Sequence, residues 1–518
     1  MKKLQPLFIL LVIYSLTLGI RIYWLSQKNG FDVDEGASVA LACYNYYMVW
    51  GNYEFNKEYT GKEVKEISLC DNDSFKNVIG DIYRLWKDNR DESHTNLYYS
   101  FLRLSLAGLK TGNIKPIIFR GGILNLIFFT ISFVFFFLLM RLLFPDSKLL
   151  QFSATVCAFL STATISNTLF LRPYQIQETM FIIFCYCFFK TLDLKKYIIN
   201  DGKIFINTRL IFLLSLVAAL TLLTGYYSIV FIGLFGIYVI FVNYRKQDYQ
   251  GIKFYVIAFF LSFPLAQTFF SRYFFGYISY RSMETTGTLF KDFFANIIAS
   301  IIKVITLFHK HFFTWSVIIV CVLCFIYLAF RRHKFMVQKP ALYIFVVSIL
   351  YSSVIMLLAP YKILRYVMPV FPFLIILPIM LFNSIKNNKI TAAAVLLLCA
   401  AISMGALDRN NIETLYTDKP EKYYFAQDID VPVFVFNKSS WKYSDIVPYF
   451  NDEQIYYFVD NYEDINLLPH REYYLVIEST LEMPDIDFAQ FEVENESSIS
   501  YFICKKYVNT EPFHPHSR

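Results

Sequence analysis

Three carboxylates lie within four positions at Asp32, Asp34 and Glu35, directly after the first long apolar run. Carboxylates this close repel one another, so the cluster costs stability unless a cation, a donor or a helix N-terminus offsets the charge. A costly cluster of this kind is a candidate for chemistry, because a carboxylate can take the proton of an attacking hydroxyl group. The alternative is that Asp34 is the N-cap of the next helix, worth about 1 kcal/mol.

A second polar segment, 91–99, contains Asp91 and His94 and leads into an apolar helix expected to end near Leu109. Asp91 is a further candidate for acid–base chemistry. His94 is either a hydrogen-bonded loop residue or a ligand for a divalent metal ion. The sequence identifies no cofactor and leaves a divalent metal ion open.

Two junctions between apolar runs carry residues suited to a phosphate group. An arginine binds phosphate bidentately and a lysine can assist it, but an arginine at a helix end can also snorkel to lipid headgroups. Glu178 lies inside an apolar run, where a carboxylate faces a cavity or a partner such as an arginine. The residues predicted to bind substrate are Arg172, Tyr174, Glu178, Lys362, Arg365 and Tyr366.

The composition is that of a multi-pass membrane protein. Of 518 residues, 56% are hydrophobic, 19% are aromatic and only 17% are charged, which excludes an ordinary soluble enzyme. The net charge of +7 is modest, and the basic residues form short clusters between apolar runs. This pattern orients helices in a bilayer and does not suggest a nucleic-acid partner.

About eleven apolar runs are long enough to span a membrane, which takes roughly 20 residues each. The first is expected to be a signal anchor. Basic clusters place the N-terminus in the cytoplasm, and the loops 26–115 and 271–311 outside. The loop 271–311 is either a lid or an interfacial aromatic belt. The runs are 5–25, 116–140, 149–169, 174–192, 209–224, 226–243, 252–270, 312–330, 341–359, 367–383 and 390–406.

Two regions follow from this reading: a membrane module over 1–406 and a small extracytoplasmic α/β domain over 407–518. Within the first loop, residues 36–50 are expected to form an interfacial helix. Cys43 and Cys70 share this loop, and their spacing leaves open whether they pair. The tail is expected to contain a helix and four strands, at 441–450 and at 431–436, 454–459, 473–478 and 499–507.

Four motifs in this order resemble the C-superfamily (GT-C) membrane glycosyltransferases. They are an Asp-Glu pair after the first apolar run, D-x-x-H-x-x-L-Y-Y at 91–99, R-P-Y at 172–174 and R-Y-x-x-P-x-x-P at 365–372. The resemblance covers about residues 1–406. It is to the family 39-like branch of protein O-mannosyltransferases and lipid A aminoarabinose transferases. It implies an integral membrane enzyme that takes a sugar from a polyprenyl phosphate.

By position, the resemblance implies that Asp34 is the catalytic acidic residue, with Glu35 beside it. It places Asp91 and His94 at the rim of the site. It also makes Arg172 an outer-face arginine and Arg365 an arginine near the donor phosphate. The chain departs from the family at Thr95-Asn96, where two prolines are frequent, and at Gly225, where a histidine is common. The second departure puts a histidine-dependent metal role in doubt.

The chemistry of such a transfer matches these residues. A phosphate ester leaves as a stable anion, so one base and a basic cradle suffice, unlike the two carboxylates of glycoside hydrolysis. Attack opposite the phosphate predicts inversion.

The sequence therefore predicts a hexosyl- or pentosyltransferase of a bacterial plasma membrane, with Asp34 as base. It would move sugar from a polyprenyl-phosphate donor to a protein, lipid or glycan acceptor at the outer face of the membrane. The alternatives are a transporter or flippase, a polymerase or ligase of lipid-linked saccharides, and a non-catalytic assembly factor. The chain shows no internal repeat and its charges gather at one face, which favours an enzyme over a transporter.

Overall fold

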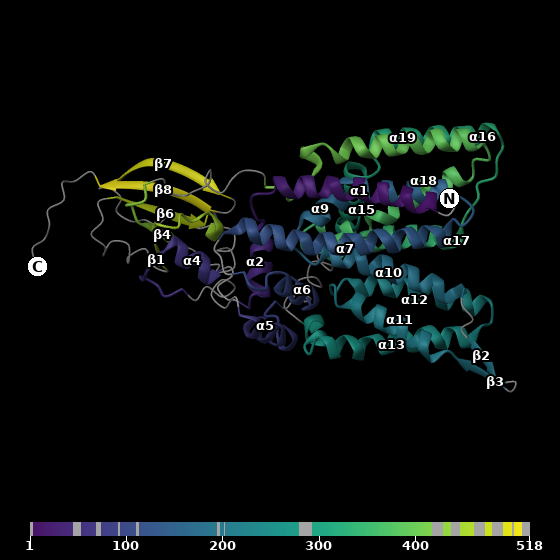
Figure 1. Ribbon diagram of the computed structural model, residues 1–518, viewed down its shortest axis with the longest axis horizontal. Helices are drawn as coiled ribbons and strands as arrows, with labels where there is room; N and C mark the ends of the chain where they lie inside the picture. The colour runs from purple at the N-terminus through teal and green to yellow at the C-terminus, as the bar shows by residue number, and fades with distance from the viewer. Residues whose placement is uncertain are drawn as a thin grey trace, which may run out of the picture. The chain divides into compact units, whose positions relative to one another are not determined.

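The computed structural model describes residues 4–44, 53–68, 74–91, 94–109, 113–193, 197–200, 203–278, 293–416, 428–436, 446–459, 472–478, 491–499 and 502–509. Within these ranges the chain is mostly helical (Figure 1). The α-helices are α1 (Leu4–Gln27), α2 (Val33–Ala42), α4 (Gly61–Ser68), α5 (Phe75–Lys87), α6 (Leu97–Ser105), α7 (Ile114–Leu143), α8 (Lys148–Leu160), α9 (Thr162–Leu169), α10 (Tyr174–Asp193), α11 (Thr208–Leu222), α12 (Ser228–Arg245), α13 (Tyr249–Phe269), α15 (Phe293–His311), α16 (Trp315–Phe330), α17 (Lys339–Leu358), α18 (Ile376–Asn383) and α19 (Asn388–Ala406). Short 3-10 helices are η1 (Tyr273–Ile278), η2 (Leu364–Tyr366), η3 (Met368–Ile375), η4 (Arg409–Asn411) and η7 (Val447–Tyr449).

Each predicted apolar run contains a helix or a pair of helices, but the count of eleven spans is not confirmed. Among the described residues, six helices are long and apolar enough to cross a membrane, or up to eight if two bent pairs each count as one span. The pairs α8–α9 and α15–α16 bend by 57° and 91°. In the run 367–383, Pro369 and Pro372 remove backbone donors, and η3 replaces the first turns of an α-helix. The chain is a multi-pass integral membrane protein.

A six-stranded mixed sheet has the order β1-β5-β4-β6-β8-β7. The central strand β4 is parallel to both neighbours, and the outer pairings are antiparallel. The edge strand β1 comes from the first loop and not from the tail. Helix α4 follows β1 directly and packs against η7. The strands are β1 (Glu58–Thr60), β4 (Val433–Phe436), β5 (Ile455–Val459), β6 (Glu472–Glu478), β7 (Phe491–Ile499) and β8 (Phe502–Asn509).

The strands predicted in the tail are present as β4, β5, β6 and β8, whereas β7 was not predicted as a strand of its own. Of the helix expected at 441–450, only the end from Ile446 is described, and it carries η7. An α/β domain formed by the tail alone is therefore not confirmed. A small hairpin of β2 (Tyr197–Asn200) and β3 (Lys203–Ile206), also unpredicted, joins α10 to α11.

The described part of 36–50 contains a helix, α2, as expected, but most of its residues are buried and its position at a membrane interface is not tested. Cys70 lies outside the described residues, so its pairing with Cys43 is not tested. The centre of the loop 271–311 is also outside them, and the described flanks of that loop form η1 and α15.

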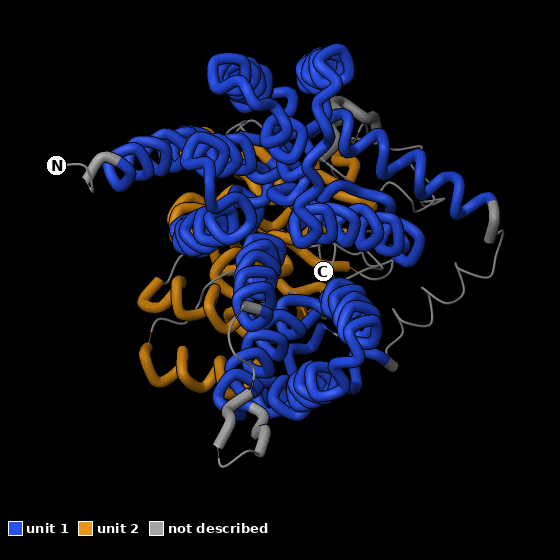
Figure 2. The backbone as a smooth tube through the Cα atoms, turned by 90° about the vertical axis from the view of Figure 1, so that its right-hand side faces the viewer, with its two compact units in different colours: residues 1–25, 86–98, 122–414 blue, residues 26–85, 99–121, 415–518 orange. Residues whose placement is uncertain are grey.

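The chain divides into two compact units, blue and orange in Figure 2. The first contains Met1–Leu25, Trp86–Tyr98 and Gly122–Thr414, and the second contains Ser26–Leu85, Tyr99–Gly121 and Leu415–Arg518. The first loop is thus shared between the units, and most of it belongs with the tail. The predicted site residues are also shared: Asp34 and Glu35 are in the second unit, and the others are in the first.

Candidate functional site

The acidic cluster is built around the N-terminus of α2. Asp32 is the N-cap, and its Oδ1 accepts a hydrogen bond from the Asp34 backbone N–H at 3.0 Å. The Glu35 carboxylate accepts one from the Asp32 backbone N–H at 2.8 Å, which completes a capping box. The interpretation of Asp34 as the cap is therefore wrong. The reciprocal D-x-x-E spacing selects Asp32, and Asp34 lies in the first turn of the helix.

Glu35 has a second structural partner. Lys28 Nζ lies 2.7 Å and 2.9 Å from its two carboxylate oxygens, and both side chains are completely buried. The hydroxyl of Tyr416 donates to Asp32 Oδ2 at 2.9 Å. A cation, a donor and a helix N-terminus thus all offset the charge of the cluster. Asp32 and Glu35 therefore hold the turn together, and the role of Asp34 as a base stays a prediction.

Three predicted residues of the first unit form one polar chain. Arg172 Nη2 lies 2.9 Å from His94 Nε2, and His94 Nδ1 lies 2.7 Å from Asp91 Oδ2. A guanidinium can only donate, so Nε2 accepts and the ring proton sits on Nδ1, where it is donated to Asp91. The imidazole therefore links a carboxylate to a guanidinium and orients the arginine.

The segment Trp86–Tyr98, which carries Asp91 and His94, is hydrogen-bonded to neighbouring helix ends both before and after these two residues. The Trp86 indole donates to the Thr268 carbonyl at 2.9 Å, and Asn96 donates to the Phe269 carbonyl at 3.0 Å, both at the end of α13. The Thr95 hydroxyl donates to the Leu223 carbonyl, which follows α11. Thr95 and Asn96 thus use their polar side chains to bind neighbouring helix ends.

Arg172 is positioned by the helix ends around it. Pro173 separates α9 from α10, and Arg172 lies in the junction with 5% of its surface exposed. Asn125 on α7 donates to the carbonyls of Thr168 and Phe170 at 3.1 Å and 2.8 Å, which fixes the backbone just before the arginine. Sequence reasoning missed Asn125, because a single asparagine in an apolar run has no distinguishing spacing.

Arg365 and Tyr366 lie on η2, and the Arg365 guanidinium carbon is 5.6 Å from the Tyr366 ring centroid. The Tyr366 ring makes edge contacts with Tyr174 and Tyr227 at 6.1 Å and 6.2 Å. The structure therefore brings Tyr174 and Tyr366 together, as neighbours of the two arginines in sequence. Lys362 is at hydrogen-bond distance, 3.5 Å, from the Asn296 carbonyl.

Glu178 belongs to a buried network that sequence reasoning did not foresee in full. Its carboxylate accepts from Asn167 and from Gln175, each at 3.0 Å. Gln175 accepts from Thr168 at 2.8 Å, and Thr168 accepts from Arg21 at 3.0 Å. Both charged residues are completely buried. The arginine considered as a partner for Glu178 is thus Arg21 of α1, reached through two polar side chains.

This network predicts a structural role for Glu178. We expect Glu178→Gln to destabilise the folded protein by about 1–3 kcal/mol, because one buried donor loses its acceptor. We expect the KM for the lipid-linked donor to change by less than about two-fold. Thermal unfolding and donor titration measure the two effects. A large rise in KM without loss of stability would return Glu178 to the substrate site.

The surroundings of His94 do not support the prediction that it binds a metal ion. Both ring nitrogens are engaged, with Asp91 and Arg172, so a metal would have to displace one of these partners. In the part of the chain that the structure describes, no three histidine, cysteine, aspartate or glutamate side chains are grouped to hold a metal ion. A divalent ion at His94 stays a prediction.

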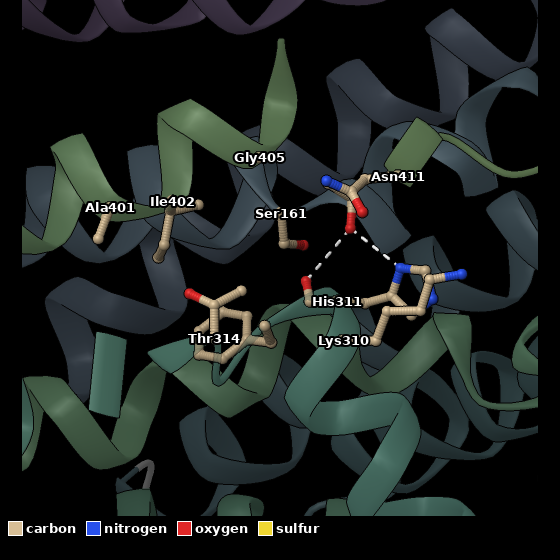
Figure 3. A pocket seen from close by; sticks show the side chains of 10 residues that line it. Ser161, Lys310, His311, Thr314, Ala401, Ile402, Gly405 and Asn411 are labelled. Atoms are coloured by element: carbon tan, nitrogen blue, oxygen red, sulfur yellow. Dashed lines mark hydrogen bonds between the residues drawn. The ribbon is translucent and has the colours of Figure 1, made fainter. Parts of the chain in front are cut away.

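A small cavity of about 30 Å³ lies where α8–α9 and α15–α16 break (Figure 3). His311 Nδ1 lies 3.0 Å from the Thr162 hydroxyl, and Lys310 pairs with Glu413 at 2.8 Å. On the scale of roughly 10–15 Å³ for one water, the cavity has room for about two waters and not for a sugar. None of the predicted site residues lines it. Its lining is Ser161, Thr162, Lys310, His311, Phe312, Thr314, Ala401, Ile402, Gly405 and Asn411.

Comparison with known proteins bears on the fold. No protein-family model matches the sequence, and no curated protein matches it. The crystal structure of ArnT from Cupriavidus metallidurans bound to undecaprenyl phosphate matches with a TM-score of 0.50 and 10% identity, over 96% of this chain and 97% of that one. The chain has the GT-C fold of ArnT. This confirms the fold that the four motifs implied.

Two weaker matches are also to solved structures. ArnT from the same organism in the apo state has a TM-score of 0.45 at 9% identity, over 96% of this chain and 97% of that one. The Archaeoglobus fulgidus oligosaccharyltransferase in complex with zinc and sulfate has a TM-score of 0.46 at 10% identity, over 91% of this chain and 68% of that one. At such identities the likeness concerns the fold, and the chemistry has to be argued from the residues.

Proposed function

We propose that the protein is a membrane glycosyltransferase that moves a sugar from a polyprenyl-phosphate donor to an acceptor hydroxyl group, with inversion at the anomeric carbon. The observation that carries the proposal is the end-to-end fold likeness to ArnT bound to undecaprenyl phosphate. The multi-pass apolar helices fit a donor with a long isoprenoid chain. The buried arginine of the Asp91–His94–Arg172 chain fits its phosphate.

In this mechanism Asp34 is the general base. It takes the proton of the acceptor hydroxyl as the oxygen attacks the anomeric carbon, and the sugar–phosphate bond breaks on the opposite face. The half-buried Asp34 is set into the first turn of α2, where the partial positive charge of the helix N-terminus favours the ionised form. Asp32 and Glu35 hold that turn. Asp91 serves Arg172 through His94 and takes no proton.

The leaving phosphate needs positive charge. Arg172 is the better supported of the two arginines, because its side chain is buried and oriented by His94. Arg365 is the second member of the cradle, with Lys362 as an accessory cation. The aromatic side chains of Tyr174 and Tyr366 would bound the same pocket.

The donor is the first thing to measure. The purified protein is incubated with undecaprenyl-phosphate-linked hexoses and pentoses, each radiolabelled in the sugar, together with a membrane extract. We expect one donor to be consumed and the label to appear on a lipid, glycan or protein. Donor consumption should fall by about 10²–10⁴-fold in Asp34→Asn. Movement of an intact labelled donor across vesicles without cleavage would instead identify a flippase.

Sidedness is part of the proposal. We propose that the N-terminus is cytoplasmic and that the active site and the tail are extracytoplasmic. A cysteine at the exposed tail position Asp430 should react with an impermeant maleimide on intact cells. A cysteine at the exposed Lys334 should react only after the cells are opened. The reverse pattern would invert the topology and move the site to the cytoplasm.

A further inference from the structure

One residue of the tail is built into the acidic turn of the first loop. Tyr416 uses three separate contacts there. Its carbonyl accepts from the Asn29 backbone N–H at 2.8 Å, its hydroxyl donates to Asp32 Oδ2 at 2.9 Å, and its ring centroid is 5.8 Å from Lys28 Nζ. All of these residues belong to the second compact unit. A residue near the start of the tail therefore binds the turn that carries the candidate base.

The close approach depends on the two backbones involved. A Cβ atom at Gly30 would lie 3.1 Å from Tyr416 Cβ and 2.9 Å from the Tyr449 hydroxyl, so a side chain at this position would crowd both tyrosines. Tyr416 itself has a φ of 39°, a left-handed conformation that is uncommon for a residue other than glycine. Such a conformation persists where surrounding contacts determine it. The contacts of Tyr416 with Asn29, Asp32 and Lys28 contribute to holding it in this conformation.

The two oxygens of Asp32 connect Tyr416 to Asp34. Oδ2 accepts from the tyrosine hydroxyl, and Oδ1 accepts from the Asp34 backbone N–H at 3.0 Å. The Tyr416 hydroxyl thus fixes the orientation of the Asp32 carboxylate, which caps the helix. Glu35, the other residue of the capping box, is held by a buried ion pair with Lys28. In sequence, Asp34 lies between the two fixed residues Asp32 and Glu35.

We propose that Tyr416 is a positioning residue for the base Asp34, acting through the Asp32 cap. The inference rests on the proposed function for its effect on catalysis. It assigns to the tail a role in the chemical step, in addition to any role in acceptor binding. Deleting the whole tail cannot separate these roles, because the deletion removes Tyr416 with everything else. A single hydroxyl group has to be removed.

The test compares Tyr416→Phe with Tyr474→Phe in the full-length protein. Tyr474 is a matched control, because it is also a tail tyrosine whose hydroxyl donates to an aspartate, Asp428, at 3.1 Å. Hydrogen exchange is followed in peptides that cover α2. We expect Tyr416→Phe to speed exchange of the first-turn amides by about three-fold or more, because their cap is loosened, and Tyr474→Phe to leave them unchanged.

Transfer is then measured with the undecaprenyl-phosphate sugar that the wild-type protein consumes. We expect Tyr416→Phe to lower kcat by about 3–10-fold while the donor KM changes by less than about two-fold. In an Asp34→Asn background, the same substitution should change the residual turnover by less than about two-fold, since Tyr416 acts through Asp34.

Unchanged exchange in Tyr416→Phe, an equal loss of activity in Tyr474→Phe, or a full loss in the Asp34→Asn background would each overturn the proposal. If the wild-type protein transfers no sugar, the proposed function fails. The exchange measurement still decides whether Tyr416 holds the turn.

Discussion

Asp34→Asn is expected to lower turnover by a factor of about 10²–10⁴, the usual loss when a general base is removed. The fold should be retained, because Asp34 is not the cap of α2 and its backbone N–H is held by Asp32 in either variant. Donor binding should be nearly intact, since the amide keeps the size of the side chain. The measurement is single-turnover transfer together with donor affinity, so that chemistry is separated from binding.

The neighbouring carboxylate provides the matched control. Asp32→Asn also removes one negative charge from the cluster, but asparagine caps a helix about as well as aspartate. We expect it to keep at least about a tenth of the wild-type turnover. If Asp34→Asn is fully active and Asp32→Asn is not, the base is Asp32. If both are active, the proton acceptor has to be sought at Asp91.

The sequence predicted a capped helix directly after the acidic cluster, but it assigned the cap to the wrong carboxylate. The D-x-x-E spacing of Asp32 and Glu35 predicts a capping box with Asp32 as the cap. The buried partner of Glu35 is seven residues away at Lys28, in a loop with no helical periodicity to suggest the contact. Local spacing therefore predicts the capped turn, but only the folded structure shows that Glu35 is also bound by Lys28.

The pairing of the first loop with the tail was beyond sequence reasoning for a similar reason. Strand β1 has three residues, Glu58–Thr60, which is too short for an alternating pattern. Its partner β5 is almost 400 positions away, with Tyr59 opposite Tyr456. The longer tail strands are predictable from their runs of aromatic and β-branched residues. A single sequence carries no signal for which distant segment completes the edge of their sheet.

Arg172→Ala is expected to lower kcat/KM for the lipid-linked donor by about 10–10²-fold, as befits the loss of a charge-assisted hydrogen bond to phosphate. Arg172→Lys should recover little, because a lysine offers a point charge and cannot keep both the His94 contact and a bidentate grip on phosphate. Initial rates over a range of donor concentrations separate the effect on binding from the effect on turnover.

Arg272→Ala is the control for this prediction. Arg272 also binds the Trp86–Tyr98 segment, through the Asp88 carboxylate at 2.6 Å, but more than half of its side chain is exposed. An exposed pair contributes roughly 0–1 kcal/mol, so this variant should transfer sugar at close to the wild-type rate. Equal losses in the two variants would mean that Arg172 only holds the segment in place. A folded, fully active Arg172→Ala would leave Arg365 as the arginine that binds the donor phosphate.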